Sequence, residues 1–571
     1  MYIQNDTPLG GSLVWSSLVA VLPLLTLFVL LGGLRVRAWL ASLIGLAVAL
    51  LVAILAYGMP VSQAVLAGTE GAVFGFFPIL WIVINALWIY QMTVVSGHFD
   101  VLRRSFGSVS DDQRVQAVII AFCFGALLEA LAGFGTPVAI CTVMLIALRF
   151  SPLKAAVVAL VANTAPVAFG AIAVPITTLA SVTGLPEEAL GAMVGRQTPI
   201  LAVFVPFVLV ALVDGARGLR ETWPVALVAG LVFGVAQYVT SNFISLALTD
   251  IVAALLAAGA VVLLVRIRPP RRAEVPADAP QDTRETVSVS SGGGGDGGGD
   301  AGTGGSSSTD APAGSDHDDH NLDTRRDVVL AYAPYLIIIL LFSIQQIPVV
   351  DDALSATTVK FNWPGLNVVT EAGKPVSTQA FTLNWLESAG TILLIAGILT
   401  ALVLRVRPAA AVAAYGRTLV QLRTAIVTVM AVLALAYVMN TSGQTLTLGG
   451  LLAGTGGFFA VLSPVLGWLG VAVTGSDTSA NSLFGALQVT AAEGAGLDPI
   501  LLAAANSSGG VLGKMISPQN LAIAASAVAM AGREGEILRK VLLWSIVFLA
   551  GMCVLVYLQS TPVLGWMVVS G

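Results

Sequence analysis

The sequence predicts an all-α, polytopic membrane protein with about 12 transmembrane helices. Hydrophobic residues make up 57% of the chain and charged residues only 10%, whereas soluble domains carry about 25% charged residues. Mean hydropathy is +0.90, and runs of roughly 20 apolar residues, the length that crosses a bilayer, recur along the chain. In addition, two apolar segments are interrupted by prolines, glycines and polar residues, which predicts discontinuous helices.

Clusters of Lys and Arg order the spans of the first half, because such residues gather at cytoplasmic helix ends. Spans are expected at about residues 13–33, 38–57, 72–95, 155–180, 223–241 and 249–265, with one more that returns the chain to Arg217. Arg35 and Arg37 separate the first two spans. That loop is therefore predicted to be cytoplasmic and the N-terminus external.

Between the third and fourth spans lie two shorter apolar arms, at about residues 115–131 and 138–149, divided by "AGFGTP". Each arm is short for a complete crossing. The region 115–149 is therefore predicted to be a re-entrant hairpin that enters from the cytoplasm, with residues 133–137 at its tip.

A linker at 268–326 separates the two halves and contains "SSGGGGDGGGDAGTGGSSSTD". Such a composition cannot bury enough apolar surface to order itself. We predict a disordered cytoplasmic linker in which His317 and His320 are solvated. No metal, cofactor or nucleic acid is expected anywhere in the chain.

The second half repeats this pattern with the opposite orientation. Spans are expected at about residues 328–348, 384–404 and 424–440, followed by an external-side hairpin at 451–493, a broken span at 499–531 and a last span that ends near 560. The C-terminus is then external. Residues 1–222 and 327–571 are predicted to be inverted repeats, with an extra helix pair at 223–267. Inverted repeats with broken helices indicate a secondary transporter whose site lies near the bilayer midplane.

The two interrupted segments, "ALVANTAPVAFGAIAVP" (159–175) and "LAAANSSGGVLGKMISP" (502–518), align residue by residue. Asn163 matches Asn506, and Gly170 matches Gly513. Half-helix N-termini attract a small carboxylate. Polar side chains near the breaks and hairpin tips are expected to contact such a substrate: Thr136, Asn163, Thr164, Thr478, Ser479, Asn481, Asn506 and Ser507.

Three ionisable residues are predicted to lie deep in the membrane. A charge there is costly and is normally paired or functional. Glu129 and Asp477 are near-equal candidates for an acid that alternates between protonated and ionised forms and couples proton flow to anion movement. Lys514 either meets the substrate carboxylate or neutralises Asp477, and the second role is favoured.

There are two alternatives to proton-coupled transport. Polar hairpin tips and unwound carbonyls also suit Na⁺, so a sodium-coupled carrier or an exchanger of another small anion stays open. An intramembrane enzyme using Ser476 and Asp477 is a remote alternative, because the chain contains neither HExxH nor GxSxG.

Several long blocks resemble the L-lactate permease family over nearly the whole chain, apart from the linker and the loop at 349–383. They are "FGFFPILWIVINALWIYQMTVVSGHFD", "AFCFGALLEALAGFGTPVAI", "ANTAPVAFGAIAVPI", "GSDTSANSLFGALQ" and "AANSSGGVLGKMISPQNLAIA". These blocks place polar residues in order within apolar helices, which chance similarity does not reproduce.

The resemblance implies proton symport of small 2-hydroxymonocarboxylates, namely L-lactate, D-lactate and glycolate, across the cell membrane. It also implies a fold similar to the ion-transporter superfamily with its elevator-like members. A homodimer is expected only by analogy with those carriers. Glu129 and residues 133–137, 163–166, 476–481 and 506–519 match the family's motif blocks, although the family does not assign lactate binding to any of them.

Overall fold

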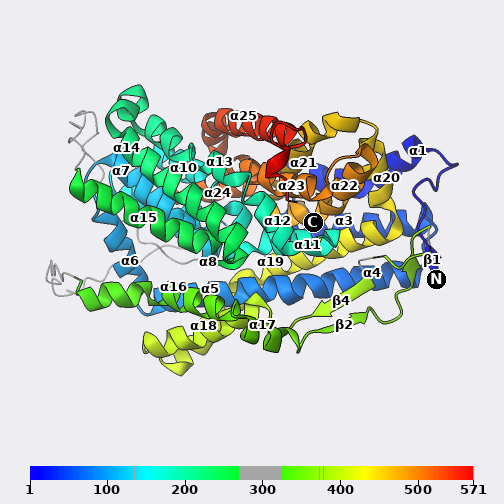
Figure 1. Ribbon diagram of the computed structural model, residues 1–571, viewed down its shortest axis with the longest axis horizontal. Helices are drawn as coiled ribbons and strands as arrows, with labels where there is room; N and C mark the ends of the chain where they lie inside the picture. The colour runs from blue at the N-terminus through cyan, green and yellow to red at the C-terminus, as the bar shows by residue number, and fades with distance from the viewer. Residues whose placement is uncertain (134, 269–322, 372, 377–378, 570–571) are drawn as a thin grey trace, which may run out of the picture.

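The computed structural model describes residues 1–133, 135–268, 323–371, 373–376 and 379–569 (Figure 1). Within these ranges ten helices are long and apolar enough to cross a membrane, and a bent helix pair raises the number to eleven. The described strands form two two-stranded sheets. The predicted class, a polytopic helical membrane protein, is therefore confirmed. Apart from its ends, the predicted linker lies outside the described residues.

The N-terminal spans follow the predicted order. They comprise α1 (Leu13–Ala20), α2 (Leu22–Phe28) and the π-helix η1 (Val29–Gly33), then α3 (Ala38–Leu55), then α4 (Val61–Phe74), the π-helix η2 (Gly75–Leu80) and α5 (Trp81–Val95). The third span begins at Val61, earlier than predicted, because polar residues such as Glu70 lower its local hydropathy. Glu70 is nevertheless buried.

A helical hairpin follows α6 (His98–Gly107). Its first arm consists of α7 (Gln113–Gln116), the π-helix η3 (Ala117–Phe124) and α8 (Gly125–Ala132), and its second arm is α9 (Thr136–Ala147). The arms pack against each other. Gly135, at the turn, has a φ of +83°, a conformation that glycine adopts without steric cost. The first arm has 20 residues, more than predicted and enough to cross a bilayer, so re-entry stays a prediction.

The first interrupted segment (159–175) is bent in the structure. Helix α10 (Pro152–Ala162) is followed by a turn, the 3₁₀ helix η4 (Val167–Phe169) and α11 (Gly170–Thr183), and the two halves meet at 63°. The next stretch contains α12 (Glu187–Val194), α13 (Thr198–Ala202) and α14 (Val205–Phe243), followed by η5 (Leu246–Leu248) and α15 (Thr249–Ile267).

The helix count differs from the predicted twelve partly because residues 187–243 form one apolar helical stretch, where the sequence predicts two spans. Within α14 the backbone leaves the helical conformation at Asp214 and Gly215. The cluster of charged residues here predicts a loop between two spans. In the structure this cluster lies at the kink. In the second half α18 is also shorter than a full crossing.

The second half begins with α16 (Arg325–Gln345) and α17 (Pro348–Ser355), and continues after the strands with α18 (Ala389–Val403) and α19 (Pro408–Ser442). Strand β2 (Val359–Asn362) pairs antiparallel with β4 (Ala380–Leu383). Strand β1 (Tyr2–Ile3) pairs in parallel with β3 (Val368–Val369). The N-terminus therefore lies beside this loop, and the external orientation of both stays a prediction.

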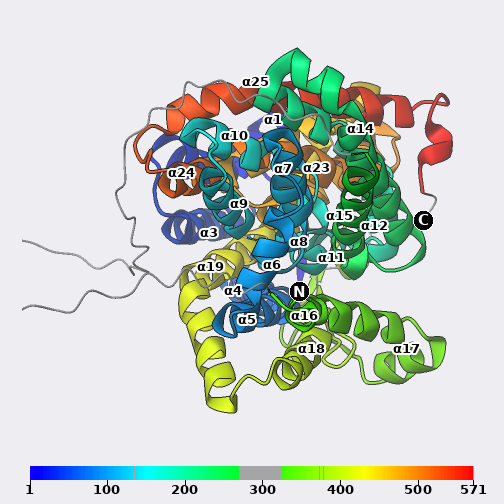
Figure 2. The same ribbon diagram turned by 90° about the vertical axis from the view of Figure 1, so that its left-hand side faces the viewer.

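The C-terminal part supplies the second hairpin and the second interrupted segment. Its elements are α20 (Gln444–Ala453), η7 (Gly456–Phe458), α21 (Phe459–Thr474), α22 (Asp477–Ala495), α23 (Pro499–Gly513), η8 (Lys514–Ile516), α24 (Pro518–Ala527), α25 (Glu534–Gln559) and η9 (Gly565–Met567). Helix α11 packs against both α8 and α22. Figure 2 shows α5, α16 and α18 on one side of the molecule and α10, α24 and α25 on the other, with α8 between them.

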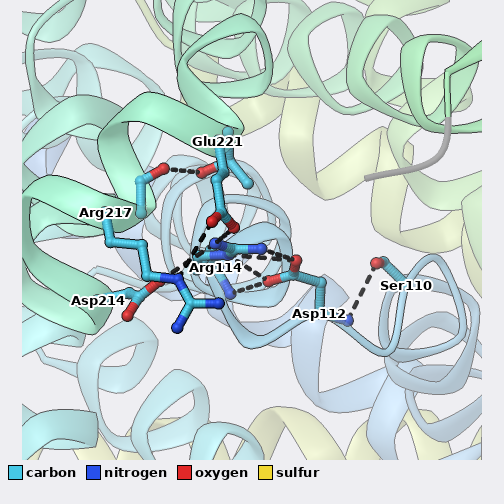
Figure 3. Close-up of polar contacts among 8 residues, drawn as sticks. Ser110, Asp112, Arg114, Asp214, Arg217 and Glu221 are labelled. Atoms are coloured by element: carbon cyan, nitrogen blue, oxygen red, sulfur yellow. Dashed lines mark hydrogen bonds and ion pairs between the residues drawn. The ribbon is translucent and has the colours of Figure 1, made fainter. Parts of the chain in front are cut away.

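A buried arginine joins the base of the first hairpin to α14. Arg114 is 1% exposed and forms ion pairs with Asp112 at 2.7 Å, Asp214 at 3.1 Å and Glu221 at 2.6 Å (Figure 3). The kink in α14 brings Asp214 into this cluster. Lys154 Nζ donates to the carbonyl oxygen of Val213 at 2.7 Å, so a second cation stabilises the kinked backbone.

We expect Arg114→Met to lower stability by about 3 kcal/mol, because it leaves three carboxylates around a buried position without their cation. The measurement is thermal unfolding of the detergent-purified protein. Arg217→Ala is the matched control: Arg217 is 62% exposed and pairs with Glu221 along one helix, so its loss should cost about 0.5 kcal/mol or less. Equal effects of the two substitutions would contradict a structural role for Arg114.

Candidate substrate and proton site

One cavity of about 820 Å³ collects the hairpin tips and the interrupted segments. Its lining from these parts consists of Glu129, Gly133, Val167, Gly170, Ala171, Val174, Pro175, Thr474, Gly475, Ser476, Asp477, Thr478, Ser479, Lys514 and Gln519. The rest of the wall comes from Val83 on α5, from Arg37, Ala38 and Trp39 at the start of α3, and from residues 423–425, 428 and 429 of α19. The segments that the sequence singles out therefore converge on one site.

The first interrupted segment is unwound at the cavity. Three successive residues, Ala171, Ile172 and Ala173, have φ values of +46°, +59° and +59°. For L-residues this left-handed conformation costs roughly 1–2 kcal/mol each, so the surrounding contacts must hold it. Gly170 precedes them, and a Cβ atom there would lie 3.0 Å from Glu129 Oε1. The absence of a side chain at Gly170 leaves room for the close approach of Glu129.

A buried ion pair lies at the centre of the site. Lys514 Nζ is 2.5 Å from Glu129 Oε1, and both side chains are less than a tenth exposed. Asn163 Nδ2 donates to the other carboxylate oxygen at 2.9 Å. The favoured prediction that Lys514 neutralises Asp477 is wrong in this conformation. Lys514 follows Gly513 on the turn η8, from which its side chain reaches the first hairpin instead.

Asp477 lies at the tip of the second hairpin, as the first residue of α22. Ser507 Oγ donates to its Oδ2 at 2.6 Å. Its other oxygen, Oδ1, has no hydrogen-bond partner in the described part of the chain. Asp477 is buried but lines the cavity, and the N-terminal end of α22 favours a negative charge there. One carboxyl oxygen of this buried group is thus left to bind a proton.

Buried amides hold the two halves of the site together. Asn481 Nδ2 donates to the carbonyl oxygen of Pro175 at 3.0 Å, and Asn506 Nδ2 donates to Asn481 Oδ1 at 2.9 Å. Gln488, which the sequence analysis did not single out, donates to Asn506 Oδ1 at 3.0 Å. None of the three lines the cavity. In this conformation the predicted ligand Asn481 positions the backbone at Pro175, and the predicted ligand Asn506 positions Asn481; neither faces the cavity.

The other predicted substrate contacts divide between the cavity and its surroundings. Thr478 and Ser479 line the main cavity. Thr136 lines a smaller neighbouring cavity of about 160 Å³, and Thr164 Oγ1 donates to the carbonyl oxygen of Val161 within its own segment. Ser507 donates its hydrogen bond to Asp477. Hydroxyl groups near the cavity are therefore concentrated at the second hairpin tip.

The second interrupted segment breaks later than its alignment with the first suggests. Helix α23 is continuous through Asn506 and ends at Gly513, and the chain resumes helical structure at Pro518. The glycines inside α23 serve close packing: a Cβ at Gly509 would meet the backbone of Pro464 on α21. Helix α10 ends at Ala162 and α11 begins at Gly170, whereas α23 ends at Gly513, so the two breaks occupy different positions of the alignment.

Two arginines at the cavity were not among the predicted site residues. Arg37 and Arg423 line it from α3 and α19, and neither has an ion-pair partner in the described ranges. Their sequence signal was ambiguous, because each lies in a basic cluster that also marks a cytoplasmic helix end. They give the entrance of the cavity a positive potential that attracts anions.

These features define a membrane transporter: hairpin tips and broken helices meet around a polar cavity inside a bundle of spans. The sequence profile described as L-lactate permease matches residues 16–563, and the chain belongs to this family. The chain is 39% identical to the L-lactate permease of Bacillus subtilis, over 99% of this chain and 100% of that one. It is 40% identical to glycolate permease GlcA of Escherichia coli, over 99% of both chains.

Among solved structures, the YdaH transporter of Alcanivorax borkumensis aligns over 88% of both chains, with a TM-score of 0.45 and 16% identity. The family resemblance inferred from the sequence is confirmed by the profile match and by the full-length relatives. The class is confirmed with it: the protein is a transporter, and the enzyme alternative is excluded by its family.

We expect Glu129→Gln and Lys514→Met each to destabilise the protein by about 3 kcal/mol, because each leaves one buried charge without its partner. The double substitution should cost clearly less than the sum, because it removes both charges. Thermal unfolding of the four proteins in one detergent measures this coupling. Additive costs would contradict the ion pair.

Proposed function

We propose that the protein imports L-lactate and related small 2-hydroxymonocarboxylates, including D-lactate and glycolate, by proton symport across the cell membrane. The observation that carries the proposal is the single cavity in which Lys514, two acids and the hydroxyls of the second hairpin meet. The names of the relatives, L-lactate permease and glycolate permease, support this substrate class.

The cavity offers complementary groups for a small hydroxylated anion. The ammonium group of Lys514 and the hydroxyls of Thr478 and Ser479 suit a carboxylate and its neighbouring hydroxyl. Asp477 lies in the same wall. An ionised Asp477 would repel the incoming carboxylate, because like charges that share a site disfavour ionisation of both. A proton that binds with the anion removes this repulsion, and this linkage is the physical basis of the proposed symport.

The proposed architecture keeps two inverted repeats, at residues 1–222 and 327–571, around the extra helix pair at 223–267. Two hairpins would enter from opposite sides among twelve spans. The alignment of the two interrupted segments supports this arrangement, as does the contact of both hairpin tips with α24: Cβ atoms at Gly135 and Gly475 would meet Ile523 and Gln519.

The proposed orientation places both termini outside and the linker 268–326 in the cytoplasm. Arg37 and Arg423 lie at the cavity, and basic residues gather at cytoplasmic ends. The cavity would then open toward the cytoplasm in this conformation. The contact of β1 with β3 supports a common side for the N-terminus and the loop at 349–383.

Uptake of labelled L-lactate into proteoliposomes tests the function. We expect an inwardly directed proton gradient to drive accumulation in the absence of Na⁺, and glycolate and D-lactate to compete. Protein-free liposomes are the control. Accumulation that requires a Na⁺ gradient at equal pH on both sides would replace proton coupling with sodium coupling, and absence of any lactate exchange would overturn the substrate.

Glu129→Gln and Asp477→Asn test the coupling residues while nearly preserving side-chain shape. We expect each variant to retain measurable exchange of labelled for unlabelled lactate but to lose accumulation driven by the proton gradient, because the amide cannot bind a proton. Uptake is normalised to the amount of protein in the membrane. Wild-type accumulation by both variants would contradict the proposed roles of these acids.

A further inference from the structure

A third buried carboxyl group lies behind the site. Asp250 occupies the first turn of α15, is 1% exposed and does not line the cavity. Its Oδ1 accepts a hydrogen bond from Gln237 Nε2 at 3.1 Å. Its Oδ2 has no hydrogen-bond partner among the described residues. The carboxyl group therefore has one amide donor and no cation in contact.

Gln237 connects this carboxyl group to the first interrupted segment. Its Nε2 also donates to the carbonyl oxygen of Ala165 at 3.2 Å, two residues after Asn163, which holds Glu129. The side-chain oxygens of Gln237 and Asn163 likewise lack donors within the described chain. An unpartnered buried polar atom costs roughly 1–3 kcal/mol, so this network has a surplus of acceptors. A proton on Asp250 would supply a donor.

The charges around Asp250 also favour a proton on its carboxyl group. Glu129 on α8, a helix that packs against α15, and Lys514 on η8 act electrostatically on Asp250, and they neutralise each other. Of the other elements packed against α15, η3 adds the buried thiol of Cys123. An ionised Asp250 would therefore add an uncompensated negative charge inside the membrane, which costs at least about 2.5 kcal/mol.

We propose that Asp250 is a proton-binding site that supplies Glu129 from the side of the protein opposite the cavity. When a substrate carboxylate engages Lys514, Glu129 loses its cation. A proton then leaves Asp250 and binds Glu129, and the ionised Asp250 takes up one proton from the adjacent aqueous phase. When the substrate departs and Lys514 returns, Glu129 releases its proton into the cavity. This route moves one proton through Glu129 for each monocarboxylate, separately from a proton bound at Asp477.

The position of Asp250 fits a supply from the opposite side. Arg266 lies at the other end of α15, roughly 24 Å away along the helix axis. Basic residues mark the cytoplasmic side, so Arg266 lies on the side toward which the cavity is proposed to open. Asp250 is thus buried in the first turn of α15, at the end of this helix opposite Arg266.

Asp250→Asn in the full-length protein in proteoliposomes tests the inference, which rests on the proposed proton symport. Exchange of labelled for unlabelled lactate is read first, because it requires substrate binding but no net proton movement. We expect Asp250→Asn to retain exchange and to lose both proton-driven accumulation and lactate-dependent proton uptake. Retention of wild-type accumulation would overturn the inference. Failure of the wild-type protein to exchange lactate would instead overturn the proposed function.

Glu70→Gln is the matched control. Glu70 on α4 is also 1% exposed, and neither carboxyl oxygen has a partner in the described part of the chain. It has no hydrogen bond to the network around Glu129, so we expect wild-type coupling. Loss of coupling in both variants would show a general need for buried acids and would overturn the specific role of Asp250.

If Asp250→Asn does not reach the membrane, Gln237→Leu tests the inference in its place. This variant keeps the carboxyl group but removes its donor. We expect the pH midpoint of lactate-dependent proton uptake to shift relative to that of wild type, a change that altered packing alone does not produce. An unchanged pH profile would overturn the inference. Asp250→Glu, which restores an acid, should recover coupling that Asp250→Asn loses.

Discussion

The ion pair between Glu129 and Lys514 is the contact on which the arrangement of the site depends. Each charge lies deep in the protein, where an isolated charge is unfavourable, so each requires the other. Because Asn163 binds the same carboxylate, one side chain of the first hairpin fixes parts of both interrupted segments. Residues more than three hundred positions apart in the sequence are thereby held around a single cavity.

The same contacts make unwound backbone tolerable inside the membrane, where each unpaired carbonyl or amide costs several kcal/mol. The carbonyl oxygens of Ala165 and Pro175 accept from Gln237 and Asn481. At the second break Asn520 donates to the carbonyl oxygen of Lys514 at 3.3 Å. Side-chain amides thus replace the helical hydrogen bonds that the breaks remove, and this explains why so many uncharged polar residues are buried here.

The sequence predicts the parts of this site that depend on local pattern. Hydropathy locates most spans, and interruptions by proline, glycine and polar residues locate both hairpin turns and the break between Ala162 and Gly170. It does not reveal that Lys514 meets Glu129, because this contact depends on the direction in which a turn presents a side chain across the fold. Asn506 illustrates the same limit. Its polarity marks the site, but only tertiary packing shows that it binds Asn481 inside a continuous helix.

The balance of buried charge connects the fold to the proposed symport. Around the centre lie three buried carboxyl groups, from Glu129, Asp477 and Asp250, and one ammonium group, from Lys514. They cannot all be ionised without an uncompensated negative charge, which burial disfavours. A monocarboxylate adds one more negative charge. Protons are the mobile positive charges that restore neutrality, so a site with an excess of acids can bind an anion when protons accompany it. In the proposed symport, the excess of buried carboxyl groups over the single buried ammonium group links anion binding to proton binding.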